Sequence, residues 1–510
     1  MATEAPARAE STNPRNDHRW LVLVVVSIAQ LMVVLDATIV NIALPSAQAS
    51  LHFDNSQRQW IITAYALAFG SLLLLGGRVG DMLGRKRTFL IALVSFATAS
   101  ALGGAAPSFA VLVVARALQG AAGAMLAPAA LGTLVTTFHN PRDRGRAFGV
   151  FGTVAVGGGA VGLILGGVLT QYLSWRWCMY VNVMFAAIAV VGALAYMTEV
   201  KSPNPPRIDV AGTALAALGL FGLVFGFSQA ETDGWVSGVT IGSLALGVIL
   251  LAAFVRVEQR VAQPLLPLRV VADRARGMAF AAVGIAGLAM FSLFLFLTYY
   301  LQLVKHFSPV TSGVAFLPMI GCVMISSNTS NIVTLPRFGP RIVITTGMTT
   351  VLLGLGYLSR LNTHSSYTGA VLPSLILMGL GMGMVMAPSM NTATAGVHPQ
   401  DSGVAAALVS TMQQVGGSIG TAVMSTIAAS VSSSYAASHA AVAGFDAAAA
   451  TQGYSRVFLA SALVFAAGGI LAAMLFPSRA QLAAKRDAVA TAESTSLDPR
   501  GLDTVPAFEA

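Results

Sequence analysis

Apolar stretches of about 20 residues recur from residue 20 to residue 476, and short polar or basic segments separate them. A helix of this length crosses the hydrocarbon core of a bilayer. Only helices and closed barrels satisfy their own backbone hydrogen bonds there. The pattern therefore predicts fourteen membrane-spanning helices. Their expected ranges are 20–45, 57–77, 87–105, 109–132, 145–172, 177–197, 209–229, 236–255, 277–302, 310–333, 341–360, 369–392, 403–431 and 454–476.

The composition agrees with this pattern. Of the 510 residues, 55% are hydrophobic and 10% are charged, and the mean hydropathy is +0.75, whereas soluble proteins contain about 25% charged residues. We therefore expect an all-α integral membrane protein within a lipid bilayer. The first apolar stretch is too long for a cleaved signal peptide and carries an acid, so we expect it to be retained. The net charge of +9 does not indicate nucleic-acid binding, because the basic residues border the spans instead of forming one patch.

Basic residues are unevenly divided between the two sides that alternating spans define. With the N-terminus inside, the inner segments hold 23 of the 29 Lys and Arg residues and the outer segments hold five, while Arg116 lies within a span. Cytoplasmic segments carry an excess of Lys and Arg, so we expect both termini to be cytoplasmic. Only 4 of these residues are lysines, and Ala and Gly abound, which is typical of a GC-rich bacterial genome. The expected location is a bacterial plasma membrane.

Two halves of the chain repeat one another. Gly123–Pro128 (GAMLAP) matches Gly383–Pro388 (GMVMAP), and Arg337–Arg341 is a degenerate copy of the basic segment Gly77–Arg87. Paired repeats of this kind are common in transporters. The repeat predicts six-helix bundles at residues 20–197 and 277–476, with an inserted two-helix hairpin at 209–255. The polar segments 1–18 and 477–510 are expected to be disordered cytoplasmic tails.

Asp36 is the one carboxylate that this pattern places deep in the membrane. A charge near the bilayer centre costs a few kcal/mol on insertion scales, and the other acids fall in tails, in loops or at helix ends. Two interpretations remain open. Asp36 is a buried acid paired for structure alone, or it is a proton- or cation-binding group of a transporter.

Arg116 is the expected partner of Asp36. Arg116, Gln119, Gly120 and Gly123 fall on one helical face of the fourth span. At about 1.5 Å per residue, Asp36 lies ~24 Å from the inner end of its span and Arg116 about 10 Å below the outer surface. Across a core of about 30 Å these depths differ by one or two helical turns. The two charges are expected to meet, directly or through water, as a proton-coupling pair or as a fixed structural ion pair.

The segment Gly77–Arg87 packs glycines, an acid and a basic cluster into one tight cytoplasmic turn. It is either a positive-inside anchor or a conformational latch, and the spacing favours the latch. Its expected gating residues are Gly77, Asp81, Gly84, Arg85, Lys86 and Arg87.

The fifth span carries Gly158, Gly162 and Gly166 at a spacing of four, with Gly167 beside them. Such a stripe lets another helix backbone lie close. Packing is the default explanation, and the stripe becomes mechanistic if its partner helix belongs to the other bundle.

Polar side chains in the apolar spans predict a central substrate cavity. Phenylalanines and methionines near them are either core packing or a soft cavity wall. The candidate cavity residues are Asn41, Gln119, Tyr299, Gln302, Asn328, Asn331, Asn391 and Gln414. No phosphate loop, metal-ligand spacing or nucleophile elbow appears, so the sequence predicts neither an enzyme nor a metal site.

Taken together, these motifs resemble those of the major facilitator superfamily, specifically its fourteen-helix drug:proton antiporters. The resemblance spans residues 20–476. It rests on Leu35–Pro45, Gly77–Arg87, Arg116 with Gln119 and Gly120, the glycine stripe, Ser174–Trp177, Tyr180–Asn182 and Phe316–Pro318. It implies two six-helix bundles that rock around a central cavity, two extra helices between them, and exchange of inward protons for outward substrate. One departure is Leu163, which follows Gly162 where the family motif usually has proline.

We therefore expect a monomeric proton-coupled antiporter, with no cofactor beyond the proton gradient, that exports amphipathic neutral or monocationic compounds such as drugs, antibiotics and dyes. The alternative is a dedicated exporter or importer of one metabolite or self-made antibiotic. A membrane receptor or membrane-embedded enzyme is disfavoured by the two-bundle repeat and by the lack of a catalytic constellation.

Overall fold

The computed structural model describes residues 18–54, 57–138, 140–199, 209–261, 264–395, 397, 402–439, 445–478 and 481. The expected tails, 1–18 and 477–510, fall almost entirely outside this set. The regular structure in the described residues is helical. In chain order the elements are α1 (Arg19–Leu51), α2 (Gln59–Leu83), α3 (Arg85–Gly104), α4 (Phe109–Thr137), α5 (Pro141–Tyr172), α6 (Trp177–Tyr196), α7 (Val210–Asp233), α8 (Gly238–Glu258), α9 (Leu268–Ala272), α10 (Arg274–Tyr299), η2 (Tyr300–Val304), α11 (Pro309–Ala315), α12 (Leu317–Thr329), η3 (Ser330–Thr334), α13 (Leu335–Leu358), η4 (Tyr367–Val371), α14 (Leu372–Thr394), α15 (Ser402–His439) and α16 (Phe445–Leu475).

Twelve helical segments in the described part of the chain are long and apolar enough to cross a membrane, where the sequence pattern predicts fourteen spans. One of the twelve, Pro309–Leu358, has 50 residues. Its path is broken at Gly339, which has φ 77° and ψ 168° and is followed by Pro340. In α2, the apolar stretch Gln59–Leu73 is shorter than the others. The architecture is therefore an all-helical membrane fold with twelve candidate spans.

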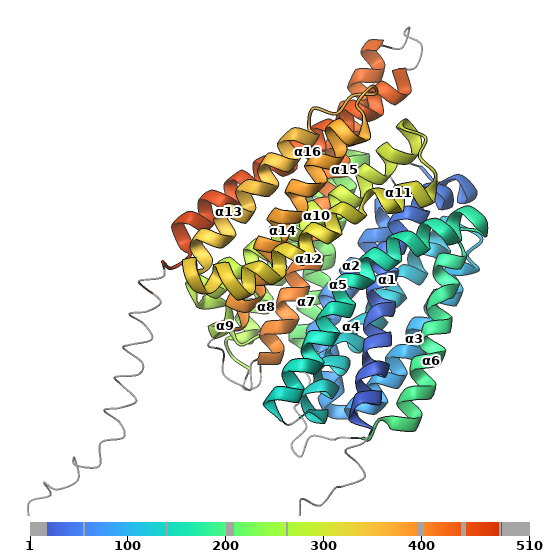
Figure 1. Ribbon diagram of the computed structural model, residues 1–510. Helices are drawn as coiled ribbons and strands as arrows, with labels where there is room; N and C mark the ends of the chain where they lie inside the picture. The colour runs from blue at the N-terminus through green and yellow to red at the C-terminus, as the bar shows by residue number, and fades with distance from the viewer. Residues whose placement is uncertain are drawn as a thin grey trace, which may run out of the picture.

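The helices form two groups with the same internal packing (Figure 1). In the first group α1 packs on α5 and α6, α2 on α4, and α3 on α4 and α6. In the second group α10 packs on α15 and α16, α12 on α14, and α13 on α14 and α16. We call these groups the first bundle (α1–α6) and the second bundle (α10–α16). The hairpin α7–α8 packs through α7 on α2 and α15, one helix from each bundle.

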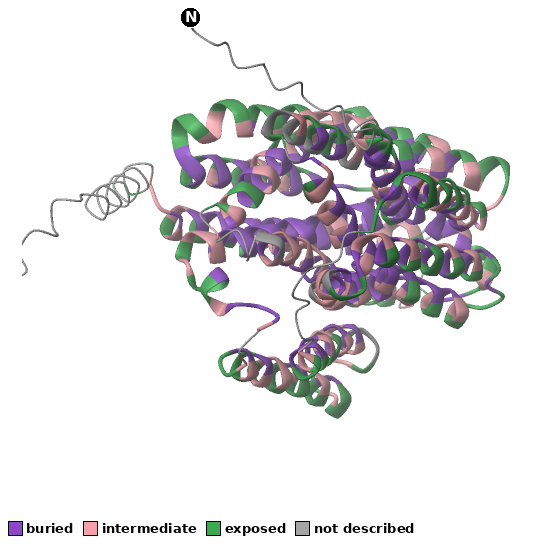
Figure 2. Cartoon of the chain, turned by 90° about the horizontal axis from the view of Figure 1, so that it is seen from below, coloured by how far each residue is buried: buried purple, intermediate pink, exposed green. Residues whose placement is uncertain are grey.

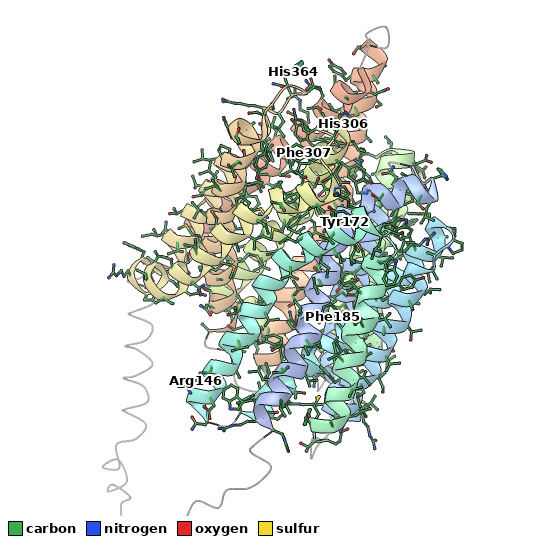
Figure 3. The ribbon with its side chains drawn as sticks, turned by 45° about the vertical axis from the view of Figure 1, so that its right-hand side comes forward. Arg146, Tyr172, Phe185, His306, Phe307 and His364 are labelled. Atoms are coloured by element: carbon green, nitrogen blue, oxygen red, sulfur yellow. The ribbon has the colours of Figure 1, made fainter. Side chains whose placement is uncertain are left out.

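We name the two ends of the molecule by their distance from the start of α1, which lies at the near end. The near end carries the start of α1 and the end of α16, and the far end carries the α1–α2 and α5–α6 turns (Figure 1). Figure 3 labels Arg146 at the near end of α5 and Tyr172 at its far end.

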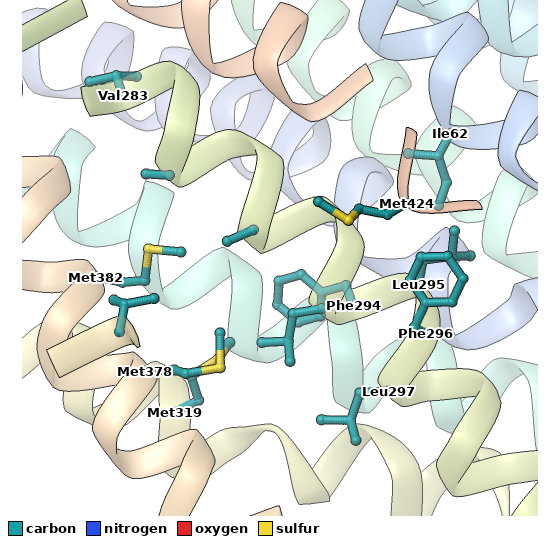
Figure 4. Close-up of a cluster of buried hydrophobic side chains, with 14 of the residues drawn as sticks. Ile62, Val283, Phe294, Leu295, Phe296, Leu297, Met319, Met378, Met382 and Met424 are labelled. Atoms are coloured by element: carbon teal, nitrogen blue, oxygen red, sulfur yellow. The ribbon is translucent and has the colours of Figure 1, made fainter. Parts of the chain in front are cut away.

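The two bundles share a hydrophobic core in their far halves. Seen from below, buried residues lie inside the helix groups and exposed ones on their outward faces (Figure 2). One cluster of buried side chains joins Ile39–Leu44 of α1 and Ile62 of α2 to α10, α12, α14 and α16. Figure 4 shows Ile62 near Leu295 and Met424 of the second bundle. A separate cluster, with Val22–Val33 of α1 at its centre, draws its buried members from the first bundle alone. The structure thus closes the far end.

Candidate functional site

Asp36 lies halfway along α1 and is fully buried. Its Oδ2 accepts a hydrogen bond of 2.5 Å from Nη1 of Arg116 on α4. Its Oδ1 accepts hydrogen bonds from Nε2 of Gln119, at 2.9 Å, and from Nδ2 of Asn182 on α6, at 2.8 Å. Both carboxylate oxygens are therefore satisfied, as a charge buried this deeply requires. The direct contact between Asp36 and Arg116 confirms the prediction made from their depths.

Arg116 is 2% exposed and is held through two of its nitrogens. Besides Asp36, its Nη1 donates to Oε1 of Gln119 at 2.9 Å, and its Nε donates to the carbonyl of Ile61 on α2 at 3.1 Å. The guanidinium carbon lies 4.4 Å from the ring centroid of Tyr65. The planar fork of arginine suits this set of partners in a way that an ammonium group does not.

Ser100 on α3 completes the network. Its Oγ accepts hydrogen bonds from Gln119 and Asn182, at 2.9 and 3.0 Å, and donates one to the carbonyl of Met179 at 2.8 Å. The polar cluster therefore draws on α1, α2, α3, α4 and α6. Every side chain in it comes from the first bundle, and all are buried.

The side chains of Arg116, Gln119 and Asn182 all donate hydrogen bonds to the carboxylate of Asp36. Protonation would neutralise Asp36, remove the ionic component of its bond to Arg116 and add a hydrogen that needs an acceptor. Oδ1 of Asn182 is buried and has no hydrogen-bond partner among the described residues. The polar contacts of α1 with α4 and α6 at this level run through the carboxylate of Asp36. Direct contact between a substrate and Asp36 would require this network to open.

Helix α1 also forms the contacts that join the bundles at the far end. Oη of Tyr299 on α10 donates to Oε1 of Gln48 at 2.5 Å, and Nε2 of Gln302 donates to the carbonyl of Ile42 at 3.1 Å. Ile42 and Gln48 lie about two and about three turns beyond Asp36 on the same helix. The buried Asp36 network and the far-end hydrogen bonds of Gln48 and Ile42 therefore lie on the same helix, α1.

The family model of the Major Facilitator Superfamily matches residues 26–421 and, in a second match, residues 337–496. This chain belongs to the Major Facilitator Superfamily. It is a membrane transporter and not an enzyme.

The transporter is similar to several curated proteins. It is 49% identical over 422 residues to the puromycin resistance protein of Streptomyces alboniger, a match that covers 82% of this chain and 83% of the relative. It is 38% identical to the cephamycin export protein of Amycolatopsis lactamdurans, over 79% of this chain and 84% of the relative. It is 36% identical to the tetracenomycin C resistance and export protein of Streptomyces glaucescens, over 79% and 75% of the two chains.

Solved structures share the fold of the transporter. A bacterial homologue of the human lysosomal transporter Spinster aligns with a TM-score of 0.64 and 12% identity, over 90% of this chain and 97% of that one. A peptide transporter of the POT family aligns with a TM-score of 0.65 and 16% identity, over 88% and 96% of the two chains. At these identities the likeness concerns the fold alone.

The glycine stripe of the transporter packs within the first bundle. A Cβ at Gly158, Gly162 or Gly166 would lie 2.0–3.0 Å from side chains of α1. Gly167 faces the other way, and a Cβ there would lie 2.6 Å from Cα of Val310 on α11. In turn, a Cβ at Gly313 would lie 2.3 Å from the carbonyl oxygen of Leu163. The stripe is thus a packing surface, while Gly167 and Leu163 form the close crossing between the bundles.

The basic turn after α2 is anchored inside the first bundle. Gly84 has φ 95° and separates α2 from α3. Nη1 of Arg85 donates to the carbonyl of Gly132 on α4, and Nζ of Lys86 donates to the carbonyl of Met197 at 2.6 Å. Glu199 accepts the backbone N–H groups of Lys86 and Arg87, at 3.3 and 3.2 Å. The side chain of Asp81 lies outside the described set, so its gating role stays a prediction.

The eight candidate cavity residues do not gather at one place. Gln119 belongs to the Asp36 network, and Tyr299 and Gln302 bridge the bundles at the far end. Asn41 donates to the carbonyl of Ala37 on its own helix at 2.9 Å. Gln414 lies where α15 crosses α2, with its Cβ 3.1 Å from a Cβ built on Gly70. The remaining three, Asn328, Asn331 and Asn391, lie toward the near end of the second bundle. There Nδ2 of Asn391 donates a hydrogen bond of 2.8 Å to Oδ1 of Asn331.

Three residues with clear structural roles, Ser100, Asn182 and Glu199, were not predicted as site residues from the sequence. Asn182 is an isolated amide in an apolar helix, and Ser100 is one of several Ser and Thr residues of α3, so neither stands out by a periodic pattern. Glu199 follows α6 in a segment that looks like any polar loop.

Proposed function

We propose that this transporter is a proton-coupled antiporter that exports amphipathic, neutral or monocationic organic compounds from the cytoplasm of a bacterium. The observation that carries the proposal is the fully buried network of Asp36, Arg116, Gln119 and Asn182. Such a carboxylate inside a membrane bundle is a functional-site hypothesis by default. The relatives named for antibiotic resistance and export support outward transport of drug-like compounds.

Two further features belong to the same proposal. The near end is cytoplasmic, because the inner segments would then hold 23 of the 29 basic residues. The number of spans is fourteen, because α2 has 25 residues and the 50-residue segment Pro309–Leu358 turns at Gly339. At about 1.5 Å per residue that segment would be ~75 Å long, more than twice a core of about 30 Å. On this orientation the structure is closed toward the outside.

Proton coupling would operate through α1. When Asp36 is ionised, the ion pair with Arg116 fixes α1 against α4. When Asp36 is protonated, α1 gains freedom to shift, and its shift reaches the far-end contacts at Ile42 and Gln48. The proton therefore changes the free-energy difference between closed and open far ends. Substrate and proton would compete because they act on the same equilibrium between closed and open far ends, and they need not occupy the same site.

The charge inventory limits the substrates. Among the described residues, Asp36 and Glu258 are the buried acids, and Glu258 accepts the backbone N–H groups of Leu265 and Leu266, at 3.3 and 3.0 Å. Burial of a second unpaired positive charge would cost several kcal/mol. Monocations and neutral amphipaths should be exported, and rigid dications with widely separated charges should be exported poorly.

A dedicated exporter of one antibiotic is the second candidate. The 49% identity to a puromycin resistance protein favours it. The two candidates differ in breadth, because a dedicated exporter would transport puromycin and ignore unrelated amphipaths.

The test is efflux from cells that carry the transporter, compared with matched cells that lack it. Ethidium, puromycin, a neutral dye and a long bis-quaternary compound are each loaded, and the proton gradient is then collapsed with an uncoupler. We expect gradient-dependent efflux of the first three and little of the last. Efflux of puromycin alone would select the dedicated exporter, and efflux that persists without the gradient would overturn proton coupling.

A further inference from the structure

Arg58 is a second buried arginine, and it lies at the far end between the two bundles. It is the N-cap residue of α2, and it is 6% exposed. Its guanidinium carbon lies 4.3 Å from the ring centroid of Tyr299, 5.5 Å from that of Phe296 and 5.9 Å from that of Tyr454. Cations are attracted to aromatic faces within about 6 Å. Arg58 therefore occupies a cage of three aromatic rings.

The groups that interact with this charge are the three aromatic rings and the side-chain hydroxyl of Tyr299. Among the described residues, no carboxylate forms an ion pair with Arg58, and its Nε is buried without a hydrogen-bond partner. A buried charge without a counter-ion is costly, and the attraction of the cation to the three ring faces offsets part of that cost. Arg116 differs, because it is paired with Asp36.

The cage and its occupant belong to different bundles. Phe296 and Tyr299 come from α10 and Tyr454 from α16, and the rings of Phe296 and Tyr454 lie 5.8 Å apart. All three rings are 4% exposed or less. Figure 4 shows Phe296 in the shared core near Ile62, which lies one turn beyond Arg58 on α2. If the bundles part at the far end, Arg58 leaves with α2 while the rings stay together.

We propose that the cage of Phe296, Tyr299 and Tyr454 is a binding site for an organic ammonium ion, filled by Arg58 while the far end is closed. This inference rests on the proposed function only for the direction of transport. In the outward-open state the empty cage would accept the cationic group of a departing substrate. On closure Arg58 would return and displace it. Arg58 is thus a tethered competitor that favours release over rebinding.

The experiment measures binding to purified full-length protein in lipid nanodiscs, without a proton gradient. The probe is benzyltrimethylammonium, and the control ligand is (2,2-dimethylpropyl)benzene, which has carbon in place of the ammonium nitrogen and therefore the same shape and no charge. We expect Arg58→Ala to bind the ammonium probe about tenfold more tightly than the unmodified protein, which corresponds to a cation–π gain of about 1.4 kcal/mol. Arg58→Lys should behave like the unmodified protein, because its ammonium still fills the cage.

The second variant removes a wall of the cage. Tyr299→Leu combined with Arg58→Ala should abolish the gain in affinity. The proposal is wrong if Arg58→Ala binds the probe no better, if the neutral isostere gains equally, or if the gain survives Tyr299→Leu. If Arg58→Ala does not stay folded, both compounds are added during solubilisation. Recovery of folded protein by the ammonium compound alone would support the proposal, and any other pattern would contradict it.

Failure of this experiment is distinct from failure of the proposed function. The binding measurement requires no transport, so it can succeed even if efflux proves independent of protons. Conversely, proton-driven efflux with no cage affinity would leave the antiporter intact and reduce Arg58 to a structural contact.

Discussion

At the scale of single residues, Asp36 and Arg116 form a buried ion pair of 2.5 Å. Removal of one partner of a buried pair typically costs about 3–5 kcal/mol, because the other charge is left uncompensated. Replacement of both partners is often nearly neutral. Single and double replacements therefore distinguish the contribution of the pair to folding stability from its proposed role in proton coupling.

We predict that Asp36→Asn lowers the free energy of unfolding by about 3 kcal/mol, because Arg116 is left buried without a counter-ion. The double variant Asp36→Asn with Arg116→Gln should recover most of that loss and still lack proton-coupled efflux. Thermal melting of the purified variants measures the first effect, and efflux measures the second. Recovery of both stability and efflux in the double variant would show that the pair is purely structural.

Arg116→Lys should reduce transport at least about tenfold, because it loses the Nε bond to Ile61 and the shared bond to Gln119. A loss of one or two such bonds to a charged group is worth about 1.5–3 kcal/mol each. The measurement is the efflux rate at matched amounts of protein in the membrane. Full activity would mean that only the positive charge matters.

The contact between Asp36 and Arg116 was predictable from the sequence because helical rise converts position along a span into depth. The shared face of Arg116 and Gln119 followed from their spacing of three. The roles of Ser100 and Asn182 were not predictable, because nothing in a single polar residue says which neighbouring helix it faces. Arg58 illustrates the same limit. Its position near a span end indicates an outer loop, and only the packing of the second bundle shows that its side chain is buried.

At the scale of helices, the fifth span works through two different faces. Its glycine stripe lies against α1 and fixes the first bundle, while Gly167 lies against α11 of the second bundle. The stripe was predictable from its spacing of four. The separate role of Gly167 was not, because a glycine next to the stripe carries no mark of which bundle it meets.

We predict that Gly167→Val keeps the far end from closing, because its Cβ would lie 2.6 Å from Cα of Val310 and 2.8 Å from the carbonyl of Pro309. Gly157→Val is the matched control, since a Cβ there has no heavy atom within 4 Å. Labelling of a cysteine placed at Gln48 by an impermeant thiol reagent reports far-end opening. Equal labelling in the two variants would contradict the assignment of α5–α11 as a closing contact.

We predict that Glu199→Gln slows transport and leaves substrate affinity unchanged, because Glu199 holds the first residues of α3 at the near end. A contact of this kind is worth about 1 kcal/mol, or a factor of about five in a conformational equilibrium. Asp81→Asn should act in the same direction if the turn is a latch. A large loss of substrate affinity in either variant would argue against a gating role.

At the scale of the whole molecule, the internal repeat reproduces the packing but not the charges. The alignment of Gly123–Pro128 with Gly383–Pro388 places Ile376 and Gly379 where the first bundle has Arg116 and Gln119. Ile376 is 37% exposed, as suits a lipid-facing or interfacial residue. The first bundle therefore holds the buried ion pair, and the second bundle supplies the aromatic cage.

The two-bundle arrangement was largely predictable, because the repeat and the alternation of apolar stretches determine which helices are equivalent. Which end is closed was not predictable, because that depends on how the bundles tilt against each other. The scattered positions of the cavity candidates have the same cause. Asn328, Asn331 and Asn391 are polar like Tyr299, but the three asparagines lie at the near end of the second bundle and Tyr299 lies at its far end.

The measurement that tests the central claim most directly is substrate-induced proton release from the purified transporter in nanodiscs. Ethidium is added to weakly buffered protein containing a pH-sensitive dye, and Asp36→Asn is compared with the unmodified chain. We predict that the unmodified transporter releases protons in proportion to the ethidium bound, and that Asp36→Asn binds ethidium but releases none. Equal release from the two proteins would show that the proton is carried elsewhere and that the buried pair of Asp36 and Arg116 is not the coupling site.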